Sequence, residues 1–306
     1  MIDPGLDNQV KCACPAMVLD GKDDLMYFLF SALMGIVQGL SEFLPISSSG
    51  HLIVAEKLLG LLGMQSSGES LAFAVMLHLG TLIAVAVIFW RDWVDMLLHP
   101  IKNRTLMMLF VASLPALAAA LVLGDKLDTL FEGWFLGISF LITAVFLVIL
   151  EWLDRKRDST GQKTVNIKDA LIMGGFQAVA LLPGVSRSGS TLLGGVSSGL
   201  SRATAAKFSF MMSAPAILGS FLMEGKNAIE EGGLSSLFDP GILVGMMFAA
   251  ASGFLAIRYM LKLIQRISFY RFAVYVGIIG VLVIIMQLTG FAGFPSLTLP
   301  GSMPGA

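Results

Sequence analysis

Two segments of the chain, residues 34–50 and residues 173–189, repeat one pattern without a gap. Each segment runs through apolar sequence, reaches a proline and then enters a turn rich in serine and glycine. The identical pairs are Met34 and Met173, Gly35 and Gly174, Gln38 and Gln177, Ser47 and Ser186, Ser49 and Ser188, and Gly50 and Gly189. Duplicated apolar segments that are interrupted in this way are typical of membrane proteins with a site between two internal repeats.

The composition indicates an integral membrane protein. Of the 306 residues, 56% are hydrophobic and 13% are charged, whereas a soluble domain carries about 25% charged residues. The apolar runs are long and continuous, so we expect helices to cross the membrane rather than strands. The net charge is −1 and no basic patch is interleaved with aromatic residues, which argues against a nucleic-acid partner.

Six apolar segments reach the length of about 20 residues that a helix needs to cross a bilayer. They are residues 70–90, 104–123, 133–153, 204–223, 240–260 and 272–290. Residues 25–60 and 169–200 break at a proline and a Ser/Gly turn, so each is expected to form a re-entrant hairpin. The predicted fold is therefore an all-α polytopic membrane protein, with six transmembrane helices and two re-entrant helical hairpins in inverted-topology repeats.

We expect a single membrane domain over residues 25–290, with repeat one at about 25–153 and repeat two at about 169–290. Residues 1–24 lack the apolar core of a signal peptide and are expected to be an N-terminal extension. Both cysteines lie there, as a weak C-x-C signal. Residues 291–306 are rich in glycine and proline and are expected to form a C-terminal tail.

Basic residues divide unequally between the two sides of this arrangement. Fourteen of the 20 Lys and Arg residues fall in the loops 91–104, 154–168, 201–207 and 258–271, five fall on the other side, and Arg187 lies inside the second hairpin. The positive-inside rule makes the first side cytoplasmic. Both termini are then outside, hairpin one enters from outside and hairpin two enters from the cytoplasm. This is the reason why we expect inverted repeats.

The two turns predict an anion site. Ser47, Ser48 and Ser49 suit the cap of the outgoing helix, whose free N–H groups and positive dipole end would point into the site. The second turn has the same form and adds the guanidinium of Arg187. Two helix N-termini and one arginine fit a phosphate group better than a cation. Capping and packing alone would explain each serine equally well.

Acid–base chemistry is indicated beside the first turn. An ionised group at bilayer depth costs roughly 2.5–3.5 kcal/mol, which makes Glu42 and His51 functional candidates. Glu42 follows Gln38 by one helical turn, and the two side chains could hold a hard divalent cation together with substrate oxygens. Ser48 and His51 are three residues apart, which suits a nucleophile and its base.

A purely structural role stays open for Arg187, His51 and His78. Arg187 could serve only as the counter-ion of Glu42, and His51 could be a buried histidine whose hydrogen bonds are satisfied. His78, inside the span 70–90, is expected to donate a helix–helix hydrogen bond rather than to take part in catalysis.

The first turn, QGLSEFLPISSSGH from Gln38 to His51, resembles a motif of the bacterial undecaprenyl pyrophosphate phosphatases, the bacitracin-resistance BacA family. That motif reads (E/Q)xxxE followed by PxSSxGH. The second turn, PGVSRSGST from Pro183 to Thr191, is similar to the family's PGxSRSGxT motif. The similarity extends from about residue 25 to residue 288. Two long motifs in the right order make the resemblance specific.

The resemblance implies a function and a setting. Members of this family hydrolyse undecaprenyl pyrophosphate to undecaprenyl phosphate and inorganic phosphate, which recycles the carrier lipid for peptidoglycan synthesis and confers bacitracin resistance. It implies a polyprenyl pyrophosphate lipid as substrate, a divalent cation (Mg²⁺ or Ca²⁺), and a multi-pass protein of the bacterial cytoplasmic (inner) membrane. The active site would face the periplasmic or extracellular side. Whether the protein forms a homodimer stays open.

The motif positions and the turn chemistry together define the expected site. The expected catalytic residues are Glu42, Ser48, His51 and Arg187. The expected pyrophosphate-binding residues are Ser47, Ser49, Gly50, Ser186, Ser188, Gly189 and Thr191. The expected metal ligands are Glu42 and Gln38. Gln38 is the less acidic option of the motif, which argues against a mechanism that needs two acids on the metal.

Two questions stay open at this point. Ser48 is the expected nucleophile, assisted by His51 or Glu42, and direct attack by water is the alternative. A lipid-phosphate flippase or anion transporter is the rival class, because inverted repeats with broken helices also build transporters. A transporter would need the anion site but not the neighbouring acid–base groups. A phosphohistidine lipid phosphatase is disfavoured, because no histidine follows Arg187 in its motif.

Overall fold

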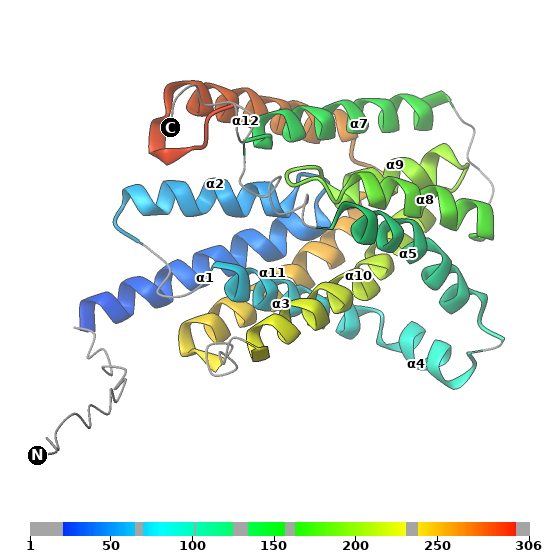
Figure 1. Cartoon of the computed structure of the whole chain (residues 1–306). Helices are drawn as coiled ribbons and strands as arrows, with labels where there is room; N and C mark the ends of the chain where they lie inside the picture. Colours follow the sequence, from blue (N-terminus) through cyan, green and yellow to red (C-terminus); the bar gives the residue numbers. More distant parts are fainter. Residues whose placement is uncertain are drawn as a thin grey trace, which may run out of the picture.

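The computed structural model describes residues 21–64, 70–100, 102–124, 134–156, 163–230 and 238–297. Over these residues the chain forms α-helices and one short 3-10 helix, and no strand (Figure 1). In chain order the elements are α1 (Gly21–Phe43), α2 (Ser48–Leu61), α3 (Ser70–Ile88), α4 (Trp90–Leu98), α5 (Arg104–Leu123), α7 (Leu136–Lys156), α8 (Ile167–Val179), α9 (Arg187–Ser197), α10 (Arg202–Glu230), α11 (Pro240–Leu263), α12 (Phe269–Thr289) and η2 (Phe291–Gly293).

Among the described residues, six helices are long and apolar enough to cross a membrane. Five of them, in α5, α7, α10, α11 and α12, coincide with predicted spans, which confirms a multi-pass helical protein. The predicted span 70–90 instead forms α3, which is bent by 77° against α4. The sixth long helix is Asp24–Phe43 in α1, so the first arm of the predicted hairpin has the length of a span.

Local sequence determines where the helices begin and end. Asn166 caps α8 through a capping box, because its side chain accepts from the N–H of Asp169 and the Asp169 carboxylate accepts from the N–H of Asn166. Asp239 caps α11 just before Pro240. Proline has no backbone N–H, and it is tolerated at the start of a helix because an N–H there has no partner within the helix. At the end of α12, Gly290 adopts a left-handed φ of 67°, which closes the helix.

The predicted terminal segments are described only in part. Residues 1–20 and 298–306 lie outside the described residues. Helix α1 already begins at Gly21, inside the predicted extension. In the predicted tail, η2 contacts α2 and α12, and Phe294 is buried. The first residues of the tail therefore belong to the helical domain.

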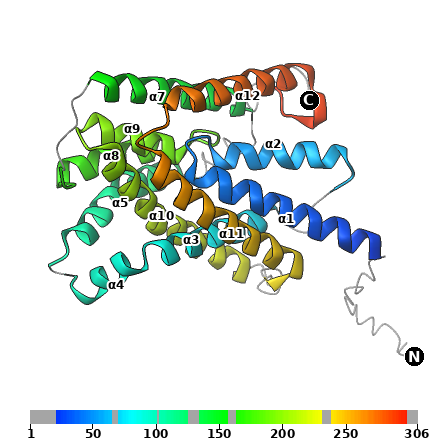
Figure 2. The same ribbon diagram turned by 180° about the vertical axis from the view of Figure 1, so that it is seen from behind.

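Two helix pairs turn back on themselves near the centre of the molecule. Helix α1 is followed by α2 and helix α8 by α9, and the members of each pair are in contact. In Figure 1 the α1–α2 pair extends from the centre to the left and the α8–α9 pair extends to the right. Figure 2 shows the same arrangement from behind, with α7 and α12 side by side along one edge.

The two halves of the chain exchange packing partners. Helix α1 packs on α11 and helix α8 packs on α5, while α3 packs on α11 and α10 packs on α5. The helices α1 and α8, α3 and α10, and α5 and α11 follow one another in the same order in the two halves. Each half therefore completes its packing with a helix of the other half.

Buried apolar side chains surround the first turn from several sides. Phe43, at the end of α1, belongs to the largest core cluster, which also includes side chains of α3, α5, α7, α9, α10 and α11. Ile46, three residues later, belongs to a second cluster with Phe140 of α7 and Val276 of α12. The turn between α1 and α2 is thus held in the interior by apolar packing.

Glycines allow α1 and α3 to approach α11 closely. A Cβ atom at Gly39 would lie 2.0 Å from Oγ of Ser252, and one at Gly80 would lie 2.4 Å from the carbonyl oxygen of Met246. Gly35 makes a similar approach one turn before Gly39. Membrane helices use such small residues because lipid offers no hydrophobic drive for association. These contacts fix the faces of α1 and α3 that carry the site.

We expect Gly39→Ala to destabilise the protein by about 1–3 kcal/mol, because the added methyl group overlaps α11. Unfolding of the purified protein in detergent measures this loss. Gly60→Ala is the matched control, since a Cβ atom at Gly60 of α2 meets nothing within 4 Å. Equal unfolding midpoints for the two variants would contradict close packing of α1 on α11.

Candidate functional site

The turns of the two helix pairs are in direct contact. Ser188 donates through Oγ to the carbonyl oxygen of Leu44 at 2.9 Å. The backbone N–H of Gly184 donates to Oγ of Ser49 at 3.3 Å. The two repeated segments thus meet, as the sequence analysis predicts.

Helices α2 and α9, which follow the two turns, each begin with a serine cap. The two serines occupy equivalent positions of the repeat. Oγ of Ser47 accepts from the N–H of Gly50 at 3.3 Å, and Oγ of Ser186 accepts from the N–H of Gly189 at 3.1 Å. Each cap satisfies one N–H group at a helix start that has no partner within the helix. The prediction that a serine of the first turn caps the helix that follows it is confirmed for Ser47, which caps α2.

Ser47 also has an unusual backbone conformation, with φ of 74°. Residues with a side chain adopt positive φ rarely and at an energetic cost. The carbonyl oxygen of Ser47 accepts from Nδ1–H of His51 at 2.7 Å and from its backbone N–H at 3.2 Å. In the second turn, positive φ occurs at Gly184 instead, where a glycine adopts it without strain. The first turn is therefore the strained one.

The carboxylate of Glu42, at the end of α1, is the centre of a buried polar cluster. Its side chain is 5% exposed. Oε2 accepts from Oγ of Ser48 at 2.5 Å and from Nε2 of Gln38 at 3.0 Å. Oε1 accepts from Nη2 of Arg187 at the start of α9, which forms an ion pair with Glu42. The structure thus brings together three expected catalytic residues and both expected metal ligands.

His78 of α3 approaches the same carboxylate from another side. Its Nε2 lies 3.8 Å from Oε2 of Glu42. Its Nδ1 donates to the carbonyl oxygen of Ala74 at 2.7 Å, which leaves a lone pair on Nε2 in the neutral ring. His78 therefore makes its hydrogen bond within α3, and the group that it contacts on another helix is the carboxylate of Glu42. His78 and Ser48 approach the same oxygen atom.

His51 makes its hydrogen bonds outside this cluster. Nδ1 donates to Ser47, and Nε2 lies 2.9 Å from the hydroxyl of Tyr275, which donates to it in the neutral ring. The ring also stacks on Tyr275 and packs edge-on against Phe140. The hydroxyl of Ser48 donates to Glu42 instead, so the expected pair of Ser48 and His51 is not formed in this structure. Sequence spacing gave no signal for Tyr275.

The remaining expected pyrophosphate-binding side chains bond within the protein. Oγ of Ser188 lies 3.2 Å from Oγ of Ser186. Oγ1 of Thr191 lies 2.6 Å from Oγ of Ser209 on α10, a partner that sequence analysis missed. These hydroxyl groups form the scaffold of the second turn. Their binding of pyrophosphate stays a prediction.

The donor atoms beside Glu42 fit a hard cation that arrives with phosphate. Oε1 of Gln38 is buried and has no hydrogen-bond partner. An amide oxygen next to a carboxylate suits Mg²⁺, which is commonly held by one or two carboxylates, water and substrate phosphates. In the described part of the chain, no group of three or more His, Cys, Asp and Glu residues could hold a metal. Among the described residues, Glu42 and Gln38 would therefore supply only part of the ligand set of such a cation.

Comparisons with known proteins point to one family. The family model described as bacitracin resistance protein BacA matches residues 31–282. A protein of Halothermothrix orenii named undecaprenyl-diphosphatase is 37% identical, and the match covers 83% of this chain and 95% of that protein. Undecaprenyl-diphosphatase 4 of Bacillus thuringiensis subsp. konkukian is 34% identical, and undecaprenyl-diphosphatase of Methanosphaera stadtmanae is 35% identical. Both of these matches cover 86% of this chain and 99% of the relative.

We expect Ser188→Ala to lower the free energy of unfolding by about 1 kcal/mol, because the carbonyl of Leu44 loses its donor from the other turn. Unfolding by sodium dodecyl sulfate in mixed micelles measures the change. The matched control is Ser197→Ala, since Oγ of Ser197 donates to Gly194 within α9. A loss no larger than that of the control would show that this contact between the turns contributes nothing to stability.

Proposed function

Because the chain belongs to the family of bacitracin resistance protein BacA, we propose that it is an integral-membrane phosphatase that hydrolyses undecaprenyl pyrophosphate to undecaprenyl phosphate and inorganic phosphate. This reaction recycles the carrier lipid for peptidoglycan synthesis and thereby confers bacitracin resistance. One observation carries the proposal for this chain. Ser48 and Arg187, from the two turns, converge on the buried carboxylate of Glu42.

Ser48 is the proposed nucleophile. Its hydroxyl already donates to Oε2 of Glu42, so the carboxylate can take the proton as Oγ attacks the terminal phosphorus. The bond from this phosphorus to the bridging oxygen breaks, and undecaprenyl phosphate leaves with the electron pair. Water then attacks the phosphoserine, which releases inorganic phosphate and restores the hydroxyl. Direct attack by water, with Glu42 as the base, is the alternative route.

Arg187 is proposed to neutralise charge on the transferred phosphoryl group. Its side chain is 17% exposed, and its guanidinium pairs with Glu42 in the resting site. A guanidinium has five N–H donors in a planar fork, so it can bind phosphate oxygens in two-point contacts. Preorganised charge of this kind is usually the largest contribution to catalysis. In this scheme His51 positions the start of α2 through Ser47.

Glu42 and Gln38 are the proposed ligands of a divalent cation, Mg²⁺ or Ca²⁺. The buried oxygen of Gln38 that lacks a partner supports this assignment. A bound cation supplies positive charge that polarises the phosphoryl oxygens. The pyrophosphate-binding role of the turn serines and glycines belongs to the same proposal. Ser47 and Ser186 cap the starts of α2 and α9, and the N–H groups at a helix start favour an anion.

We further propose that the two helix pairs are re-entrant hairpins of inverted repeats. The exchange of packing partners between the halves supports this topology. So does Figure 1, in which α1 and α8 run toward the centre from opposite ends. The uneven division of basic residues supports a cytoplasmic location for the four basic loops. The termini would then be outside, with the site open to the outer side of the cytoplasmic membrane.

A lipid-phosphate flippase or anion transporter is not favoured. The relatives are named for diphosphatase activity. Anion transport would also have no use for a serine hydroxyl bonded to a buried carboxylate.

We expect the purified protein in detergent to release phosphate from undecaprenyl pyrophosphate in the presence of Mg²⁺. Arg187→Gln should lower kcat/KM by about 10²–10³, since one charged donor to the transition state is lost. Arg258→Gln, at an exposed position of α11, is the control and should be unaffected. A chelator should stop release until Mg²⁺ is restored. Absence of release by folded protein would favour the transporter.

Ser48→Ala should lower turnover by at least about 10³, because the covalent route is lost. Acid quenching with substrate labelled in the terminal phosphate should trap phosphoserine in the native protein and none in the variant. Ser197→Ala, in α9, controls for loss of a hydroxyl elsewhere. Near-normal turnover of folded Ser48→Ala would establish direct attack by water.

A further inference from the structure

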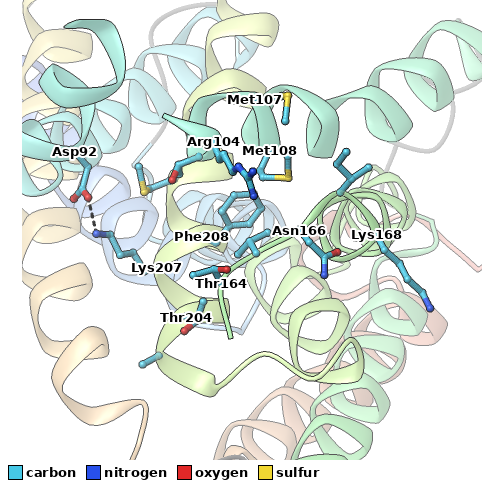
Figure 3. Close-up of a pocket in the computed structure, with 15 residues that line it drawn as sticks. Asp92, Arg104, Met107, Met108, Thr164, Asn166, Lys168, Thr204, Lys207 and Phe208 are labelled. Atoms are coloured by element: carbon cyan, nitrogen blue, oxygen red, sulfur yellow. Dashed lines mark hydrogen bonds and ion pairs between the residues drawn. The ribbon is translucent and has the colours of Figure 1, made fainter. Parts of the chain in front are cut away.

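A cavity of about 1000 Å³ lies between α4, α5, α8 and α10, away from Glu42 (Figure 3). Its lining comes from three separate parts of the chain, each in or next to one of the basic loops. These parts are Asp92 and residues 104–108, residues 164–168, and residues 203–211. None of the residues of the proposed catalytic cluster lines it. The cavity is therefore a second site, at the end of the bundle that carries the basic loops.

The mouth of the cavity has a net positive charge. Lys207 is paired with Asp92 at 2.6 Å, so these two residues add no net charge. Arg104 and Lys168 are exposed, and within the described residues neither side chain makes an ion pair or a hydrogen bond. In Figure 3 the side chain of Arg104 points in among the lining residues, and that of Lys168 points outward. An anion in the cavity would therefore meet Arg104, and Lys168 adds positive charge outside the mouth.

The floor of the cavity is apolar. Met108, Phe208 and Met211 line it and are 3%, 3% and 1% exposed. At the rim, Met107 and Ile167 are 47% and 53% exposed. A small hydrated anion gains nothing from such a floor, because desolvation of its charge is not repaid there. The lining suits a ligand with a charged head and an apolar tail.

Helix α4, beside the mouth, has the composition of a helix that lies at a membrane surface. It is bent by 77° away from α3, and it carries Asp92 into the cavity lining. Its other faces expose Trp90, Leu97 and Leu98. A short helix with exposed tryptophan and leucine beside charged residues is typical of the interface between headgroups and acyl chains. With α4 at the membrane surface, the cavity would open at the level of the lipid headgroups.

We propose that this cavity binds one anionic phospholipid of the cytoplasmic leaflet, with its phosphate at Arg104, an acyl chain over Phe208, and Lys168 adding positive charge outside the mouth. The leaflet follows from the proposed cytoplasmic location of the basic loops. The lipid would tie the starts of α5, α8 and α10 together, since the lining residues come from these three starts. Two cations near a membrane surface attract an anionic lipid, whereas a neutral lipid gains no such attraction.

The test uses delipidated protein in neutral detergent, titrated with dioleoyl phosphatidylglycerol or with dioleoyl phosphatidylcholine. Native mass spectrometry counts the bound lipid. We expect one phosphatidylglycerol to bind at least about tenfold more tightly than phosphatidylcholine. The double variant Arg104→Gln/Lys168→Gln should lose this preference. The matched control Arg258→Gln/Arg271→Gln removes two exposed cations outside the cavity and should keep it.

A second variant separates the cavity from its charge. Thr164→Trp places a large side chain at an exposed position of the lining and leaves the cations unchanged. It should also lose the preference for phosphatidylglycerol. All variants should release phosphate from undecaprenyl pyrophosphate at the native rate, so failure of the lipid site is distinguishable from failure of the proposed enzyme.

Three results would overturn the proposal. The first is an unchanged lipid preference in Arg104→Gln/Lys168→Gln. The second is an unchanged preference in Thr164→Trp, which would mean that surface charge acts without the cavity. The third is displacement of phosphatidylglycerol by millimolar inorganic phosphate, which would assign the site to a free anion.

Discussion

A chain that breaks its helices inside an apolar bundle must satisfy the exposed backbone groups without water, and this constraint organises the molecule. Here each turn supplies partners to the other. Ser188 of the second turn bonds to the carbonyl of Leu44, and Gly184 donates to Ser49 of the first. The serine caps satisfy further N–H groups within each turn. Each turn therefore gains these hydrogen-bond partners only when the two halves of the chain meet.

The same meeting creates the chemistry. Glu42 ends α1 in a buried position, where an isolated carboxylate would be costly, and Arg187 from the other half provides its counter-charge. Close packing through Gly39 and Gly80 holds α1 and α3 on a single helix, α11. That packing brings His78 to the carboxylate. The hydrogen bonds that stabilise the turns and those that prepare the proposed nucleophile thus belong to one connected network.

The sequence predicts the features that depend on local pattern. Long apolar runs predict most of the spans, and the repeated serine predicts the cap at Ser47. Features that depend on three-dimensional packing could not be predicted. His78 and Tyr275 find their partners only because helices distant in sequence pack together. Spacing suggested that Ser48 would pair with His51, but the strained backbone at Ser47 brings its carbonyl to the histidine ring instead.

The uncharged side chain of Gln38 determines the net charge of the resting site. With an amide at this position, the resting cluster contains one formal negative charge, on Glu42, and one formal positive charge, on Arg187. The pair is electrically neutral, so the resting site buries no net charge before substrate arrives. An incoming diphosphate brings several negative charges that this neutral pair does not balance. In the proposed enzyme, a divalent cation that enters with the substrate would supply the missing positive charge, which would make occupancy of the site depend on the cation that accompanies the lipid.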